Sequence, residues 1–184
     1  MIRLPDNIQP LVPEWFKGLP FLSRFMERRN LTFQHEIQKG VYLYQNNENG
    51  IPVFLIFVFY DKMGIEHLKM YLQLCESTIV RNVILIYQNQ MTSNCLKVMD
   101  NIFQFQIECF RIHEFQYDIT SLYYYVPHEK ISDEQSLQEI RKKYGSHLPV
   151  LLKSDPIVRY FGFKRNDIIK VIRSPNEFIY RQVR

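Results

Sequence analysis

The chain has 184 residues, of which 46% are hydrophobic and 15% aromatic, and its formal net charge is +4. This composition excludes an intrinsically disordered chain, because the apolar residues suffice for one good core or two small ones. The longest apolar run, residues 51–60, is about half of the roughly 20 residues that cross a bilayer. We therefore expect no transmembrane span, and we expect no secretion because the start lacks a signal-peptide pattern.

The first two thirds of the chain alternate between helical and strand patterns. A short amphipathic helix is predicted within residues 13–29, with Pro20 suited to a first helical turn. The later segments are strands at 31–37, 41–45 and 52–60, a helix at 64–77, a strand at 81–88, a helix at 92–103 with Thr92 as N-cap, and a strand at 105–112. This order predicts an α/β unit with a partly parallel sheet.

The composition changes near residues 120–127, where three consecutive tyrosines precede Val126 and Pro127. This change predicts a domain boundary. We therefore divide the chain into 1–120 and 121–184. From His128 onward there are 12 Lys+Arg and 7 Asp+Glu, a balance of +5, whereas the earlier part has 11 and 12, a balance of −1. The C-terminal part is the basic one. A helix is predicted at 133–144, opened by a capping box of Ser132 and Gln135 and closed by Gly145.

The stretch SDPIVRYFGFKRNDIIKVIR, residues 154–173, is the most distinctive in the chain. Asp155 and Pro156 are suited to begin a two-turn helix, and Gly162 can end it in a left-handed conformation. Asn166 tolerates a positive φ, so the basic turn can reverse the chain into a strand that pairs with residues 177–183. Taken alone, the pattern predicts a small helix that leads into a hairpin.

The same order of residues resembles the C-terminal assembly module of the subunit shared by eukaryotic nuclear RNA polymerases, a module that corresponds to a small archaeal RNA polymerase subunit without a jaw. The matching positions are Val126, Pro127, His128, Leu148, Pro149, Ser154, Asp155, Pro156, Arg159, Tyr160, Gly162, Lys170, Arg173, Tyr180 and Arg181. The earlier part resembles the eukaryotic family's N-terminal jaw module, which has a nuclease-like α/β fold, for example in the strand and threonine-led helix of residues 82–99.

The sequence also departs from the family's pattern. Pro127 directly precedes His128, Asn166 replaces the glycine of the basic turn, and Ser93 replaces a proline after the jaw threonine. The loop between Arg173 and Tyr180 is also shorter than in the family. These departures favour a divergent version carried by a large DNA virus over a cellular one.

The resemblance implies a non-catalytic subunit of a multisubunit DNA-directed RNA polymerase. Its C-terminal module would dock on the largest subunit, among other polymerase subunits, and its jaw would lie beside downstream duplex DNA. The expected docking residues are Asp155, Pro156, Arg159, Tyr160, Gly162, Lys170, Tyr180 and Arg181. The expected DNA-proximal residues are Thr92, Ser93 and Lys97, and Thr92 has the alternative of being a plain N-cap. The site of action would be the nucleus in a cell, or the cytoplasmic virus factory, the nucleus or the virion for a virus.

A search for independent chemistry finds no catalytic motif. No Glu-x-Lys, P-loop, Gly-x-Ser-x-Gly or metal-ligand spacing of the five histidines occurs. The three cysteines have no Cys-x-x-Cys spacing, which favours reduced thiols. We therefore expect no cofactor, metal, membrane or small-molecule substrate. The alternative function is a free-standing nucleic-acid-binding transcription regulator that uses the basic C-terminal third.

Overall fold

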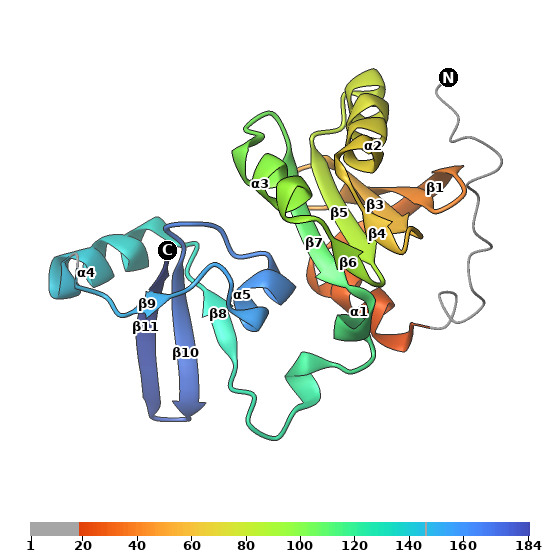
Figure 1. Cartoon of the computed structure of the whole chain (residues 1–184). Helices are drawn as coiled ribbons and strands as arrows, with labels where there is room; N and C mark the ends of the chain where they lie inside the picture. The colour runs from red at the N-terminus through yellow and green to blue at the C-terminus, as the bar shows by residue number, and fades with distance from the viewer. Residues whose placement is uncertain (1–18, 146) are drawn as a thin grey trace. The chain divides into compact units, whose positions relative to one another are not determined.

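The structure, a computed structural model, describes residues 19–145 and 147–184. The chain divides into two compact units, Met1–Tyr117 and Asp118–Arg184. Both combine helices with β-sheet (Figure 1), which confirms the predicted mixed α/β class. Across the described ranges, none of the helices has the length and apolar character needed to cross a membrane.

The N-terminal unit contains the predicted elements and two short extra strands. In chain order its elements are α1 (Pro20–Arg28), β1 (Leu31–Gln38), β2 (Val41–Asn46), β3 (Pro52–Val58), β4 (Lys62–Met63), α2 (Ile65–Thr78), β5 (Asn82–Tyr87), β6 (Gln90–Met91), α3 (Ser93–Asn101), β7 (Gln106–Arg111) and the 3-10 helix η3 (Ile112–Phe115). The part of the predicted first helix before residue 19 lies outside the described residues.

One five-stranded sheet, with the order β1-β2-β3-β5-β7, organises this unit. Strands β1, β2 and β3 are antiparallel because short turns connect them. Strands β3, β5 and β7 are parallel because α2 and α3 lie in the connections between them. The small strands β4 and β6 pair separately, in parallel, and bring residue 62 beside residue 90.

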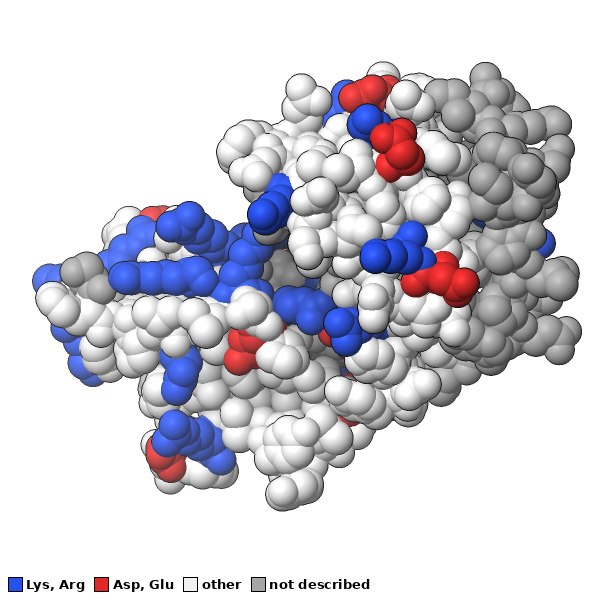
Figure 2. All heavy atoms as spheres, in the orientation of Figure 1, with Lys and Arg blue, Asp and Glu red and all other residues white. Residues whose placement is uncertain are grey.

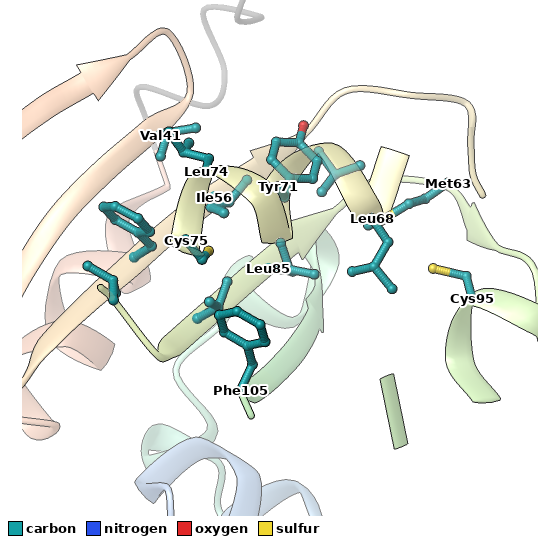
Figure 3. Packing of buried hydrophobic residues seen from close by; sticks show 14 residues of the cluster. Val41, Ile56, Met63, Leu68, Tyr71, Leu74, Cys75, Leu85, Cys95 and Phe105 are labelled. Atoms are coloured by element: carbon teal, nitrogen blue, oxygen red, sulfur yellow. The ribbon is translucent and has the colours of Figure 1, made fainter. Parts of the chain in front are cut away.

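Helices α2 and α3 cover one face of the sheet with a continuous core (Figure 3). Ile56 and Leu85 of the sheet pack there with Leu68 and Cys75 of α2, and all four side chains are buried. Burial raises the pKa of the Cys75 thiol to about 12, so this thiol stays protonated and behaves as a small apolar group. All three cysteines are free, as expected from their spacing.

The opposite face is held by an aromatic cluster that encloses a cation. Phe25 of α1 is fully buried and meets the rings of Phe110 and Phe115 edge to face, at 5.2 and 5.1 Å between centroids. The guanidinium of Arg29 lies 4.5 Å from the Phe25 centroid and donates to the Glu108 carboxylate at 2.7 Å. This ion pair joins the end of α1 to β7. Because the Arg29 side chain is only 8% exposed, loss of the carboxylate would leave a buried charge without it.

The C-terminal unit is a four-stranded sheet with the order β8-β10-β11-β9 and one helix for each face. Its elements are the 3-10 helix η4 (Ile119–Ser121), β8 (His128–Lys130), α4 (Glu134–Tyr144), β9 (Val150–Leu151), α5 (Pro156–Phe161), β10 (Ile168–Ser174) and β11 (Glu177–Val183). Strands β10 and β11 form the predicted antiparallel hairpin, and β9 joins its edge in parallel.

The start of α4 corrects one prediction. The helix begins at Glu134, and its N-cap is Asp133, whose carboxylate accepts a hydrogen bond from the Ser136 backbone N–H at 2.8 Å. The predicted capping box of Ser132 and Gln135 is therefore wrong by one residue. A carboxylate favours this position because it also carries a negative charge at the positive end of the helix dipole. The predicted end of the helix at Gly145 is confirmed.

We predict that Glu108→Ala destabilises the N-terminal unit by about 2 kcal/mol. This value is below the roughly 3–5 kcal/mol for breaking a fully buried pair, because Glu108 keeps some contact with solvent. The reason for the loss is that the charge of Arg29 remains enclosed by aromatic rings without its carboxylate. Urea denaturation followed by circular dichroism measures the change. Glu66→Ala, which removes an exposed pair with Lys69, is the matched control and should leave the midpoint unchanged.

Candidate docking and nucleic-acid interfaces

The distinctive stretch of residues 154–173 forms a capped helix, a turn and a strand. The Asp155 carboxylate accepts from the Ile157 backbone N–H at 2.8 Å, and Pro156 occupies the first turn of α5. Gly162 ends the helix with φ 69°, and the Phe163 N–H then returns to the Val158 carbonyl at 3.0 Å. The predicted helix, N-cap and left-handed end are therefore confirmed.

The basic turn after α5 is closed by a carboxylate. Asn166 adopts φ 73°, as predicted, and its N–H donates to the Val183 carbonyl at 2.9 Å. One Asp167 oxygen accepts from the Lys164 backbone N–H at 2.8 Å, and the other pairs with the Lys130 ammonium at 3.0 Å. The turn is thus bonded to both β8 and β11, which fixes the path of its basic side chains.

Helix α5 packs on one face of the sheet through its apolar residues. Val158, 1% exposed, lies in a cluster with Ile169, Val171 and Val183. Tyr160 is also buried, at 7% exposure, so little of its surface is accessible to solvent. Among the expected docking residues on this helix, Pro156 is exposed and Arg159 is partly exposed. The accessible surface of α5 is therefore mainly the one around these two residues.

His128 lies between charged residues at the start of β8. Its ring Nδ1 is 2.6 Å from the Val126 carbonyl, a distance at which a neutral imidazole donates its N–H. Burial lowers the pKa of His128, while the hydrogen bond to Val126 and the charge of Asp155 oppose this shift and the charge of Arg181 adds to it. Asp155 and Arg181, far apart in the sequence, thus both act on this imidazole, and the Arg181 guanidinium also donates to the Val150 carbonyl at 3.4 Å.

The strand register divides the expected docking residues between the two faces of the sheet. Arg181 pairs with Ile169, whose side chain is in the cluster under α5, so Arg181 belongs to the α5 face. Lys170 pairs with Tyr180, and Tyr180 packs in the cluster with α4, so these two belong to the other face. A single flat partner surface cannot cover both faces at once.

On the α4 face, three rings and a lysine form an aromatic row. The ring of Tyr180 lies 6.0 Å from that of Tyr144 and 5.4 Å from that of Phe178. The Lys170 ammonium lies 4.6 Å from the Phe178 centroid. Phe178 and Tyr144 are 46% and 40% exposed, so the row presents apolar surface to solvent. The sequence alone did not indicate Phe178 and Tyr144. Phe178 shares a face with Tyr180 because the two residues are two positions apart in β11, and Tyr144 lies at the end of α4.

In the N-terminal unit, the expected DNA-proximal residues surround the start of α3. The Thr92 hydroxyl accepts from the Cys95 backbone N–H at 3.2 Å, so the predicted N-cap is confirmed. The Thr92 N–H donates to the Met63 carbonyl at 3.0 Å, which ties this point to β4. Ser93 and Lys97 are exposed on the helix. Through the pairing of β4 with β6, Lys62 also lies near this point, which the sequence alone does not indicate.

The exposed surfaces of the C-terminal unit indicate the class of protein. A compact unit that exposes fixed guanidinium, ammonium and aromatic groups around a capped helix and a hairpin has the character of a macromolecular docking module. Among the residues that the structure describes, no group of three or more His, Cys, Asp or Glu side chains could hold a metal ion. Residues 117–183 match the family model of RNA polymerase Rpb5, C-terminal domain.

The relatives of the chain are subunits of DNA-directed RNA polymerases. DNA-directed RNA polymerase V subunit 5A of Arabidopsis thaliana is 33% identical over 95 residues, which cover 50% of this chain and 42% of that protein. The subunit RPABC1 of DNA-directed RNA polymerases I, II and III of Caenorhabditis elegans is 28% identical over 142 residues, 73% of this chain and 66% of that protein. The chain thus spans less than two thirds of these relatives, and the longer match extends into its N-terminal unit.

Among solved structures, the ATP-dependent Type ISP restriction-modification enzyme LlaBIII bound to DNA matches 80% of this chain and 12% of its own, with a TM-score of 0.47 and 12% sequence identity. A likeness of this size carries no argument about function.

We predict that Asp155→Ala lowers the free energy of unfolding of the C-terminal unit by about 1 kcal/mol, the usual cost of losing an N-cap. Asp155→Asn, which keeps an acceptor oxygen for the Ile157 N–H, should recover most of that loss. Denaturant unfolding of the two variants measures the difference. Equal destabilisation by both would show that the charge of Asp155, not its cap, is what the fold requires.

We also predict that His128 makes the protein less stable in mild acid. Because the folded state lowers the pKa of His128, its neutral form is favoured by folding. The stabilisation is complete above the unfolded-state pKa of about 6.5 and is lost as the pH falls below it toward the folded-state value. Melting temperatures across this range should therefore fall more steeply for the native protein than for His128→Asn. Parallel curves would exclude His128 as the source.

Proposed function

We propose that this chain is a non-catalytic subunit of a multisubunit DNA-directed RNA polymerase. The observation that carries the proposal is the match of residues 117–183 to the family model, because this part holds the capped helix and the hairpin. The names of the relatives, which are polymerase subunits over matches of up to 142 residues in the proteins named above, support the same role for the longer chain. In a cell that role belongs to the nucleus, and for a virus to the cytoplasmic factory, the nucleus or the virion.

In this role the C-terminal unit docks on the largest polymerase subunit. The expected contacts on the α5 face are Asp155, Pro156, Arg159, Tyr160, Gly162 and Arg181, and those on the α4 face are Lys170 and Tyr180. Arg159 is our main candidate, because it stands on a helix that is capped at both ends and packed on the sheet. A guanidinium held on such a rigid base loses little freedom when it binds a carboxylate or a carbonyl of a partner.

The N-terminal unit lies beside downstream duplex DNA in this proposal. The first backbone N–H groups of α3 lie at the positive end of the helix dipole, with the exposed residues Ser93 and Lys97 beside them. Thr92 contributes its position as N-cap, because its hydroxyl is engaged by Cys95. Contacts of this kind reach phosphates and not base edges, so they suit a subunit that must hold any DNA sequence.

We predict that Arg159→Glu reduces incorporation into polymerase by about 30-fold or more, the effect of losing an interface hot spot of about 2 kcal/mol. The measurement is recovery of the two largest polymerase subunits with the tagged protein, from cells or infected cells that contain its native polymerase. Circular dichroism of the free variant checks that it remains folded.

Lys170→Glu, an equal charge reversal on the opposite face of the same sheet, tests the α4 face, and Lys39→Glu at an exposed position of the N-terminal unit is the matched control. A loss with Arg159→Glu alone supports docking through the α5 face. A loss with Lys170→Glu alone moves the interface to the aromatic row. Failure of the native chain itself to recover any polymerase subunit would reject the proposed function.

A further inference from the structure

Three separate segments of the C-terminal unit meet at one end of its sheet. The Lys153 N–H donates to the Arg184 carbonyl at 2.9 Å, which joins the segment after β9 to the end of β11. The Asn166 N–H donates to the Val183 carbonyl at 2.9 Å, which joins the basic turn to the same end of β11. The backbone therefore holds these segments side by side, although they are distant in the sequence.

Each of these segments contributes basic side chains, which we call the sheet-end basic patch: Lys153, Lys164, Arg165 and Arg184. All four residues are exposed. In the orientation of Figure 2, Lys and Arg side chains crowd the C-terminal unit, and few acidic side chains are visible among them. The fold thus gathers at one place positive charges that the sequence distributes over three segments.

The two aspartates on the same segments are fewer than the four basic residues, so the patch keeps a net positive charge. Asp155 accepts from the Ile157 N–H at the start of α5. Asp167 accepts from the Lys164 backbone N–H and pairs with Lys130 of β8. Both carboxylates are thus engaged by backbone groups or by a lysine outside the patch. Within the described part of the chain, Lys153 and Arg165 form no ion pair, and the Arg184 guanidinium contacts the neutral Gln182 side chain.

We propose that the sheet-end basic patch binds the phosphate backbone of a nucleic acid. The charge of the patch is complementary to phosphate. Its basic side chains are attached to hydrogen-bonded backbone, which distributes them over one end of the sheet. The composition favours nucleic acid over an acidic protein, because protein interfaces are built around apolar and aromatic anchors and are depleted of lysine. The large exposed apolar residue on these segments is Leu152, at 61% exposure, which by itself is no such cluster.

This inference goes beyond the proposed function, which places nucleic acid at the N-terminal unit. The patch would give the chain a second contact to phosphate, on the unit that also docks on polymerase. Phosphate contacts carry no base information, so the patch would bind duplex DNA and transcript RNA through the same chemistry. The DNA and RNA probes of the following test distinguish these two ligands.

The test uses the purified full chain and a fluorescent DNA duplex, with an RNA of the same sequence in a parallel series. Affinity is measured by anisotropy over a range of salt concentrations for the native chain and for Lys153→Gln combined with Arg165→Gln. Each lost phosphate contact changes the slope of log affinity against log salt by about 0.9. We therefore expect the double variant to bind more weakly and its slope to become shallower by about 2.

Lys39→Gln combined with Lys69→Gln is the control, since it removes the same charge from exposed positions of the N-terminal unit. The control should keep the native slope. A shallower slope for the patch variant on DNA or on RNA supports the proposal and identifies the nucleic acid that the patch prefers. Equal slopes for the native chain and the patch variant on both probes would overturn the proposal. Polyglutamate is measured as a third probe, and if the patch variant loses binding to polyglutamate while its slopes on nucleic acid stay equal to the native ones, the patch is assigned to an acidic protein. None of these outcomes depends on recovery of polymerase subunits, so the proposed function is judged separately.

Discussion

The packing of Val158 against the β10–β11 hairpin is the contact on which the C-terminal unit depends. Helix α5 has six residues, far fewer than the roughly 12–15 that give a marginal helix in water. It persists because Asp155 satisfies an N–H at its start, Gly162 turns the chain at its end, and Val158 is buried on the sheet. The basic turn and the position of Arg159 both follow from this helix, so the proposed functions rest on a small apolar contact.

Much of this unit could be predicted from the sequence because its local signals agree with its tertiary structure. Asp155 before a proline starts a helix, Gly162 seven residues later ends it, and Asn166 reverses the chain, each through a local preference of its residue type. The strands of the N-terminal unit were equally clear, since continuous apolar runs such as β3 are typical of a sheet covered on both faces. In these cases the cause of the structure lies within a few residues of sequence.

The errors and omissions concern choices among neighbours or contacts between distant segments. Asp133 and Ser132 are both good N-caps, and the structure uses Asp133. The ion pair of Lys130 with Asp167 joins residues on β8 and in the basic turn, so no local sequence pattern predicts it. The division of Lys170 and Arg181 between two faces likewise depends on strand register. The candidate docking set could therefore be proposed from the sequence, but its geometry could not.

The arrangement of charge in the C-terminal unit links its folding to its proposed partners. Three of its aspartates have structural roles, because they cap α4 and α5 and close the basic turn. Its lysines and arginines stand mostly outside, because a long side chain can keep its charge in water while its stem lies on the surface. Folding thus gives the aspartates structural roles, while most of the lysines and arginines remain exposed. The excess of basic residues from His128 onward, 12 Lys+Arg against 7 Asp+Glu, makes this unit electropositive, and the fixed backbone around its caps and turn holds the exposed basic residues in place.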